Sequence, residues 1–250
     1  MTPVVVIPMA GEGKRFAERG YTFPKYLSTI RGKPMIQWVI ESLKLPDADY
    51  LCVCRTEHNK QYHVEQMLQQ LVRRVRVLTL DAPTDGAART VQVALEHVKN
   101  TQSLAHHDLL IVNSDQWFQW NPEDFFAKIH AVYADGGILV FPSVHPKWSF
   151  AKLDSAQEWV EEVAEKRPIS PWATCGVYWW RKAQDFEDAA GEMFLKEQKV
   201  GGEYYVAPVY NYAIRSGAKV LAYPIAEMYG LGTPEDLEEF KMAVCVGKVE

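Results

Sequence analysis

A short glycine-containing segment near the amino terminus carries residue types that bind phosphate. Gly11 and Gly13 follow a run of four β-branched residues, and Lys14 and Arg15 come soon after. Glycines at such a place let the backbone approach a ligand closely and present N–H groups to phosphate oxygens. The segment is neither a dinucleotide fingerprint, since Phe16 replaces the third glycine, nor a Walker A loop, which ends in Gly-Lys-Ser/Thr. The pattern therefore predicts an anion-binding loop outside these two classes.

Positive charge concentrates in this part of an otherwise acidic chain. The 250 residues include 27 Lys and Arg and 32 Asp and Glu, which gives a formal net charge of -5. Between Gly11 and Pro34 the balance is reversed, with the cations Lys14, Arg15, Arg19, Lys25, Arg31 and Lys33 against Glu12 and Glu18. A solvated charged loop is the simpler interpretation of a charge run. The glycines, the position after a strand and the pair Pro24-Lys25 favour a loop directed at a polyanion such as a nucleoside triphosphate.

The elements that must position this loop alternate between short apolar runs and amphipathic stretches. We predict strands at 4–7, 50–54, 75–80, 109–112 and 137–141, and helices at 35–43, 57–71 and 85–98 and after the cap at 121–124. Strand–helix alternation predicts a Rossmann-like α/β fold, a mostly parallel sheet with helices on both faces. In the second half, strands at 149–153, 159–163 and 174–180 predict a small antiparallel extension. Helices at 183–197 and 206–216, a strand at 219–223 and a helix after Pro234 complete the chain.

Three sequence patterns together resemble a known family. They are Gly11-x-Gly13-x-Arg15, Pro24-Lys25 and Gly32-Lys33-Pro34-Met35-Ile36, and they resemble the signature of the sugar-phosphate nucleotidyltransferases. The spacing Arg15-Phe16-x3-Gly20-Tyr21-x2-Pro24-Lys25 is most similar to a short bacterial cytidylyltransferase-like subgroup of capsule and surface-polysaccharide pathways. The resemblance implies transfer of a nucleoside monophosphate, CMP from CTP, to a sugar 1-phosphate or another small phosphate ester, with release of pyrophosphate. It also implies one domain over 1–250, with a nucleotide-binding half at about 1–143 and an acceptor-binding half at about 144–250.

The resemblance also implies a role for each site residue. The nucleotide-binding residues would be Met9, Ala10, Gly11, Glu12, Gly13, Lys14, Arg15, Lys25, Asp85 and Gly86, with Lys25 at the α-phosphate and Asp85-Gly86 at the nucleobase. The catalytic residues would be Arg15, Lys25 and Asp115. The acceptor-binding residues would be Lys166, Gly176 and Glu203. Asp85 has a second interpretation as the cap of the helix at 85–98.

Asp115 is the candidate metal ligand. It follows the predicted strand at 109–112, and ligands bind at the carboxyl edge of open α/β sheets. A carboxylate there would hold Mg²⁺ together with phosphate oxygens and water, whereas the simpler interpretation is a turn cap. The family's second acid, before a C-terminal Gly-Thr, is absent, since Gly230 and Leu231 stand at that place; Glu227 is a candidate substitute. We expect Lys25 and Asp115 to face each other across one cleft.

Several other classes of function receive less support. The acidic balance argues against nucleic acid as a partner, and apolar runs far shorter than about 20 residues argue against a membrane. Four cysteines without paired zinc spacing suit a reducing cytoplasm. The sequence is compatible with a homo-oligomer. Two alternatives stay open: a metal-dependent glycosyltransferase using a nucleotide-sugar, although the chain around Asp115 has no Asp-x-Asp, and a non-catalytic nucleotide-binding regulatory module.

Overall fold

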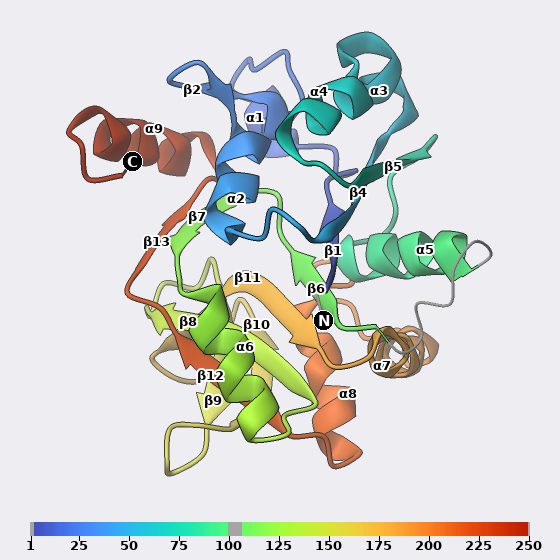
Figure 1. The fold of residues 1–250 in the computed structure, drawn as a ribbon, viewed down its shortest axis with the longest axis vertical. Helices are drawn as coiled ribbons and strands as arrows, with labels where there is room; N and C mark the ends of the chain where they lie inside the picture. Colours follow the sequence, from blue (N-terminus) through green and yellow to red (C-terminus); the bar gives the residue numbers. More distant parts are fainter. Residues whose placement is uncertain (1–2, 100–106, 250) are drawn as a thin grey trace.

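Buried apolar runs form the strands of one nine-stranded sheet in a computed structural model that describes residues 3–99 and 107–249 (Figure 1). The described residues form the strands β1 Val4–Pro8, β2 Thr29–Ile30, β3 Lys33–Pro34, β4 Asp49–Arg55, β5 Val75–Leu80, β6 Leu109–Val112, β7 Gln116–Gln119, β8 Gly136–Pro142, β9 Ser149–Leu153, β10 Val160–Glu165, β11 Trp172–Trp180, β12 Val220–Pro224 and β13 Glu227–Gly230. Four of these lie outside the nine-stranded sheet, since β2 pairs with β3 and β7 pairs with β13 in two separate two-stranded sheets. The helices are α1 Lys14–Ala17, α2 Met35–Leu43, α3 Thr56–Tyr62, α4 Val64–Leu71, α5 Ala87–Lys99, α6 Pro122–Ala131, α7 Ala183–Leu195, α8 Tyr210–Arg215 and α9 Pro234–Cys245, with 3₁₀ turns η1 Lys25–Leu27 and η2 Ala207–Val209.

The main sheet is mixed. β1 pairs in parallel with β4 and β6, β4 with β5, and β8 with β12. The long strand β11 runs antiparallel between β6 and β8, and β9 and β10 form the antiparallel extension beside it. The predicted fold class, a Rossmann-like sheet with a small antiparallel part, is therefore confirmed.

Helices cover both faces of the sheet, which explains why β1 is apolar throughout. Val4 and Val6 pack in a core with α5, α7 and α8, whereas Val5 and Ile7 point the other way into a core with α2, α4 and α6. Successive residues of a strand alternate between the two faces, so a strand covered on both sides must be apolar at every position. Figure 1 shows α5 and α7 on one side of the β1 region and α2 on the other.

The pairing of β1 with β6 brings two loops together. These strands are adjacent and parallel, with Val4 opposite Leu109 and Val6 opposite Ile111. The glycine loop at residues 9–13 leaves the carboxyl end of β1, and residues 113–115 leave the carboxyl end of β6. Both loops therefore lie at one edge of the sheet, the edge at which α/β sheets bind ligands.

Some predicted elements differ from the structure. The single helix predicted at 57–71 is wrong, because His63 adopts a left-handed conformation (φ 51) that separates α3 from α4. The helix predicted at 206–216 is divided into η2 and α8. The antiparallel pair β7–β13 was not predicted at all, since each strand has only four residues.

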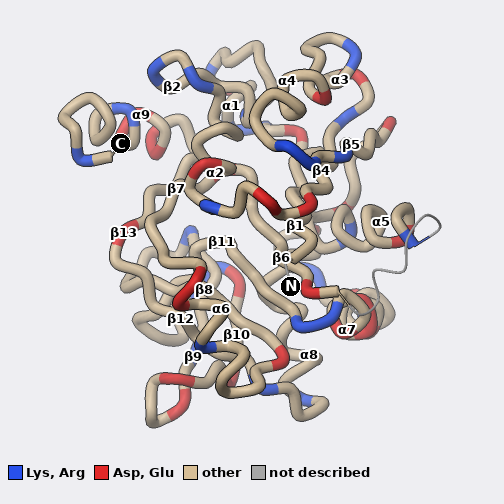
Figure 2. Tube along the Cα trace, in the orientation of Figure 1, with Lys and Arg blue, Asp and Glu red and all other residues tan. Residues whose placement is uncertain are grey.

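Charge is distributed over the whole molecule rather than gathered on one basic surface. Figure 2 shows Lys and Arg interspersed with Asp and Glu along the trace. Part of the amino-terminal cationic segment is neutralised locally, since Arg19 pairs with Glu235 and Lys33 pairs with Glu41. Among the helices of the described residues, none has the length and apolar character needed to span a bilayer.

Candidate active site

A cleft of about 820 Å³ lies at the carboxyl edge of β1 and β6. It is lined by residues of the glycine loop, of η1, and of the segments at 83–87, 113–116, 147–149, 165–166, 201–207 and 232–236. The site residues predicted from the sequence line this cleft, except Gly176 and the candidate acid Glu227. Residues separated by up to about two hundred positions in the chain therefore meet in one place.

The glycine loop forms one wall of the cleft. Gly13 adopts a left-handed conformation (φ 64) and begins α1, with its carbonyl accepting from the N–H of Phe16 at 2.9 Å. The buried Phe16 ring packs edge to face on Tyr21 and anchors the turn. Lys14, 76% exposed, pairs with Glu12 at 2.8 Å, and this hydrogen bond raises the pKa of Lys14 and lowers the pKa of Glu12. A pair this exposed contributes little to stability and leaves the ammonium available to an anion.

Lys25 and Asp115 meet across the cleft. Lys25 Nζ lies 2.7 Å from Asp115 Oδ2, and the two side chains are 24% and 23% exposed. Pro24 (φ -50, ψ 139) directs the chain into η1, whose buried Tyr26 fixes the turn that carries Lys25. The structure thus brings together the cation and the acid that the sequence placed on opposite sides of one cleft.

The carboxyl-terminal part of the chain holds the Asp115 loop in place. The N–H of Leu231 donates to the Asp115 carbonyl at 2.7 Å, directly after the β7–β13 pairing. A side chain at Gly232 would bring its Cβ to 3.0 Å from Asp115 Oδ2, so this glycine leaves the carboxylate its space. At Gly230 a Cβ would lie 2.6 Å from the Trp148 ring. Gly230, one of the two residues that stand where the family's second acid would be, is therefore covered by the Trp148 indole.

The suggestion that Glu227 replaces the missing acid is wrong. Glu227 pairs with Gln119 in the β7–β13 ladder and lines a different cavity. Asp236, in the first turn of α9, does line the cleft. Its N–H donates to Thr233 Oγ1, the cap of α9, at 3.1 Å. Its carboxylate pairs with Lys147 at 2.6 Å.

The donor set of the cleft fits Mg²⁺ better than a metal that needs nitrogen or sulfur ligands. In residues 3–99 and 107–249 no group of three or more His, Cys, Asp or Glu side chains is arranged to hold a metal ion. Mg²⁺ is commonly bound by one or two carboxylates together with substrate phosphates and water. The Asp115 carboxylate at the mouth of the glycine loop supplies such a ligand.

Gly86 is required by the protein itself. Its φ is 133, and an added Cβ would collide with the backbone of Tyr204. The N–H of Tyr204 donates to the Asp85 carbonyl at 2.8 Å, and the Tyr204 carbonyl accepts from the N–H of Ala88 at 3.0 Å. A capping Asp85 side chain would accept from the N–H of Ala88, but the Tyr204 carbonyl accepts from it instead. The Asp85 carboxylate pairs with Lys199 at 2.8 Å. The cap interpretation of Asp85 is therefore wrong, although both residues line the cleft.

The opposite end of the cleft combines a lysine with acids and aromatic rings. Lys166 Nζ donates to the Tyr205 hydroxyl at 2.5 Å and lies 4.5 Å from the centre of that ring. Burial and the adjacent Glu203 raise the pKa of Tyr205, so its hydroxyl stays protonated. Burial also raises the pKa of Glu165, whose carboxylate accepts a hydrogen bond from Ser149.

Gly176 lies beneath the cleft rather than in its lining. Its carbonyl accepts from the N–H of Asn113 at 2.9 Å, and an added Cβ would collide with the side chains of Gln116 and Asn113. The close backbone contact at Gly176 is therefore with the segment that carries Asp115. The glycine acts on the cleft through that segment.

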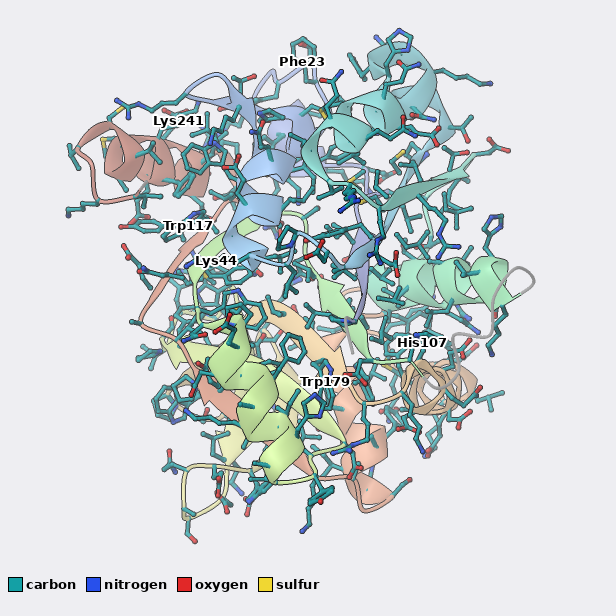
Figure 3. The ribbon with its side chains drawn as sticks, in the orientation of Figure 1. Phe23, Lys44, His107, Trp117, Trp179 and Lys241 are labelled. Carbon is teal, nitrogen blue, oxygen red and sulfur yellow. The ribbon has the colours of Figure 1, made fainter. Side chains whose placement is uncertain are left out.

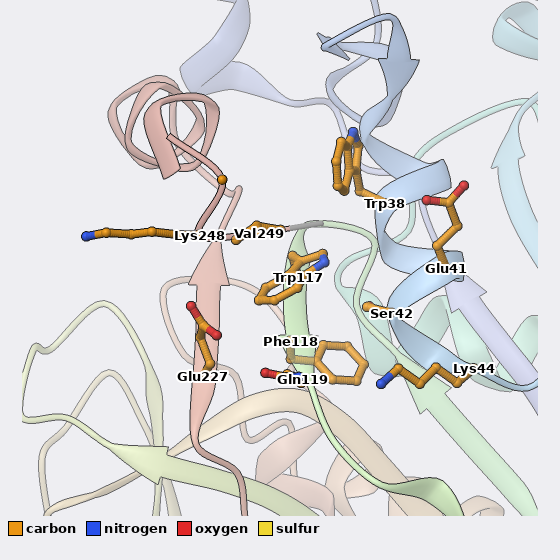
Figure 4. Close-up of a pocket in the computed structure, with 11 residues that line it drawn as sticks. Trp38, Glu41, Ser42, Lys44, Trp117, Phe118, Gln119, Glu227, Lys248 and Val249 are labelled. Carbon is orange, nitrogen blue, oxygen red and sulfur yellow. The ribbon is translucent and has the colours of Figure 1, made fainter. Parts of the chain in front are cut away.

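A second cavity of about 350 Å³ is lined by residues of α2, β7 and the carboxyl-terminal segment 247–249. In Figure 4, Trp38 and Glu41 lie on α2 and Trp117 and Phe118 lie on the neighbouring strand β7, with Lys248 near the carboxyl end. Trp117 packs on Tyr229 and Phe240 and lines this second cavity rather than the cleft. In Figure 3 it lies well apart from Trp179.

Comparison with known proteins agrees with the fold. The model of a family described as nucleotidyl transferase matches residues 4–245. A solved structure described as the nucleoside-diphosphate-sugar pyrophosphorylase from Vibrio cholerae RC9 is similar, with a TM-score of 0.85 and 28% sequence identity over 95% of this chain and 99% of that one.

Two more distant structures share the fold. A UDP-glucose pyrophosphorylase complexed with UDP-glucose gives a TM-score of 0.74 at 15% identity, over 98% of this chain and 99% of that one. An apo UDP-glucose pyrophosphorylase gives 0.77 at 14% identity, over the full length of both chains. None of the curated protein sequences compared gives a significant match.

Proposed function

The chain belongs to the nucleotidyl transferase family, and from that premise we propose that it transfers a nucleoside monophosphate from a nucleoside triphosphate to a small phosphorylated acceptor. The observation that carries the proposal is the contact of Lys25 with Asp115 at the mouth of the glycine loop. A cation and a metal-binding acid are what two anionic reactants need in order to approach each other.

The reaction follows from the charges of the cleft. An oxygen of the acceptor phosphate attacks the α-phosphorus in line and forms a new P–O bond. The bond from the α-phosphorus to the oxygen bridging to the β-phosphate breaks, and pyrophosphate leaves with the electron pair. Lys14 and Arg15 bind the β- and γ-phosphates, and Lys25 stabilises charge that develops at the α-phosphate.

A divalent cation completes this charge balance. Asp115 would hold Mg²⁺, which when bound supplies further positive charge to the phosphate oxygens. Lys25 and the metal both use the Asp115 region, so we expect the Lys25–Asp115 ion pair to loosen when the triphosphate enters. The ammonium then meets phosphate oxygens in place of the carboxylate.

The two ends of the cleft bind different substrates. Residues up to about 143 bind the nucleotide, through Met9 to Arg15 and through Asp85 and Gly86 at the base. Residues from about 144 bind the acceptor, through Lys166 and Glu203. Gly176 supports the acceptor end by giving Gln116 and Asn113 their positions.

We propose CTP as the donor, on the subgroup resemblance of the amino-terminal motifs, and a product that serves as a precursor of a surface polysaccharide. The acceptor is a sugar 1-phosphate or another small phosphate ester. The neighbour described as a nucleoside-diphosphate-sugar pyrophosphorylase supports a sugar phosphate.

Pyrophosphate release tests the proposal. The purified protein is incubated with Mg²⁺, each of ATP, CTP, GTP, UTP and dTTP, and a panel of sugar 1-phosphates and other phosphate esters. Release that requires an acceptor, greatest with CTP, is the expected result. Consumption of a nucleotide-sugar without pyrophosphate release would indicate a glycosyltransferase, and nucleotide binding without turnover would indicate a regulatory module.

A further inference from the structure

Lys147 is a cation of the cleft to which the proposed reaction assigns no role. It lies in the segment between β8 and β9, and its Nζ is 2.6 Å from Asp236 Oδ1. The two side chains are 33% and 13% exposed, so the pair is reachable from the cleft that both residues line. The ammonium also lies 4.6 Å from the centre of the Trp148 ring, which holds it over an aromatic face.

The backbone places Lys147 on the same rim as Lys166. The carbonyl of Trp148 accepts from the N–H of Lys166 at 3.0 Å, one step beyond the β9–β10 ladder that ends with Ser149 opposite Glu165. Residues 147 and 166 are therefore close neighbours across two antiparallel chain segments. Both residues line the cleft, so both lysines are exposed to a ligand that occupies this rim.

Trp148 also connects this rim to Asp115. Its ring packs edge to face on Phe141 and covers Gly230, and the next residue, Leu231, donates to the Asp115 carbonyl. Lys147 is thus tied through one side chain to the segment where the reaction takes place. Its position suits the reacting end of an acceptor better than the far end.

The charge of a phosphate monoester calls for more than one lysine. Such a group carries about -1.5 to -2 at neutral pH, whereas Lys166 supplies one positive charge. When Lys147 leaves Asp236, the amino terminus of α9 still stabilises the Asp236 carboxylate. Asp236 lies in the first turn of α9, where the helix terminus favours a negative side chain, and its N–H is already bound by Thr233.

We propose that Lys147 is a second ligand of the acceptor's phosphate group and that Asp236 holds its ammonium in the cleft until the acceptor binds. The proposal rests on the proposed function for the identity of the acceptor as a phosphate ester. Asp236 and the acceptor phosphate compete for one ammonium. Removing the lysine and removing the carboxylate must therefore have opposite effects on the affinity for the acceptor.

Steady-state kinetics with the best acceptor of the panel test this opposition. Lys147→Gln is expected to raise the acceptor KM by about tenfold to a hundredfold, the value of one charged hydrogen bond, and to leave the KM of the triphosphate within about threefold. Asp236→Asn is expected to lower the acceptor KM by about twofold to fivefold. Lys147→Arg retains the charge and should restore most of the affinity. Lys152→Gln, whose lysine pairs with Glu161 outside the cleft lining, is the matched control and should change nothing.

A purely structural ion pair predicts a different pattern. Both Lys147→Gln and Asp236→Asn would then shift the acceptor KM in the same direction, with a matching fall in Tm, and that result would overturn the proposal. If no phosphate ester supports turnover, the proposed function fails, but calorimetric titration with inorganic phosphate still tests the site. Phosphate affinity that falls in Lys147→Gln and rises in Asp236→Asn supports the assignment, and affinity unchanged in both overturns it.

Discussion

Lys25 and Asp115 are 90 positions apart in the chain, yet their charged groups lie 2.7 Å from each other. The contact depends on the parallel pairing of β1 with β6, which brings the ends of both strands to one edge. It also depends on the Leu231 hydrogen bond, which holds the Asp115 backbone. The reactive charges therefore lie on loops whose roots are fixed by the core of the sheet.

Lys25→Ala is expected to lower kcat by a factor of about 10² to 10³, as for the loss of one donor that stabilises transition-state charge. The reason is that the ammonium acts on charge developing at the α-phosphate. Lys33→Ala is the matched control, because Lys33 belongs to the same cationic segment but pairs with Glu41 outside the cleft lining. Pyrophosphate release at saturating substrates is measured for both variants, and near-normal turnover by folded Lys25→Ala would disprove the assignment.

Asp115→Asn is expected to raise the Mg²⁺ concentration needed for half-maximal rate by about tenfold or more, since an amide is a poorer ligand for a hard cation than a carboxylate. A rate measured against Mg²⁺ concentration checks this. Asp188→Asn, at an exposed position of α7, serves as the control. An unchanged Mg²⁺ requirement in Asp115→Asn would show that the metal is held elsewhere.

Two glycine substitutions are expected to have opposite effects on stability. Gly86→Ala should lower the free energy of unfolding by about 1–3 kcal/mol and reduce activity, because its Cβ meets the Tyr204 backbone and its φ is 133. Gly191→Ala should raise it by about 0.4–1 kcal/mol, because Gly191 lies inside α7 with open space at the Cβ position. Urea unfolding of both variants measures the difference. Equal effects would mean that the Tyr204 segment moves aside freely.

The Glu165 carboxyl should make stability depend on pH. Burial raises its pKa above the usual 4.5, so between these two values the folded protein holds a proton that the unfolded chain has lost. The stabilising contribution is therefore present below about pH 4.5 and is lost as the pH rises through the raised pKa. Glu165→Gln has no such proton, so its stability relative to the parent should improve with rising pH in urea unfolding. A constant difference between the two proteins across this range would contradict the assignment.

The glycine loop and the Asp115 segment could be predicted from the sequence because each follows a short, fully apolar strand. Val4 to Ile7 and Leu109 to Val112 are buried on both faces, and this pattern identifies the strands and the edge at which they end. The cationic segment was predicted less well. Only Lys14, Arg15 and Lys25 line the cleft, whereas Arg31 donates to the Val244 carbonyl and Arg19 pairs with Glu235.

The missed residues depend on contacts between distant parts of the chain. Asp236 reads as an ordinary first-turn acid, because its cap with Thr233 is local and its pair with Lys147 is not. Gly86 and Gly176 read as ligand-facing glycines, but the Tyr204 backbone and the Gln116 side chain occupy the space beside them. Such neighbours leave no trace in local periodicity. The pairing of β7 with β13 is equally invisible, since neither strand is long enough to give an alternating pattern.

The hydrogen bond from Leu231 to Asp115 also limits when the site can form during translation. Asp115 emerges from the ribosome roughly a hundred residues before the amide that fastens its carbonyl, an interval of about 5–20 s at ordinary speeds of translation. During that interval the nascent chain contains the glycine loop, but the hydrogen bond that holds the Asp115 backbone cannot yet form. The complete site can therefore form only after Leu231, which follows β13, has been synthesised.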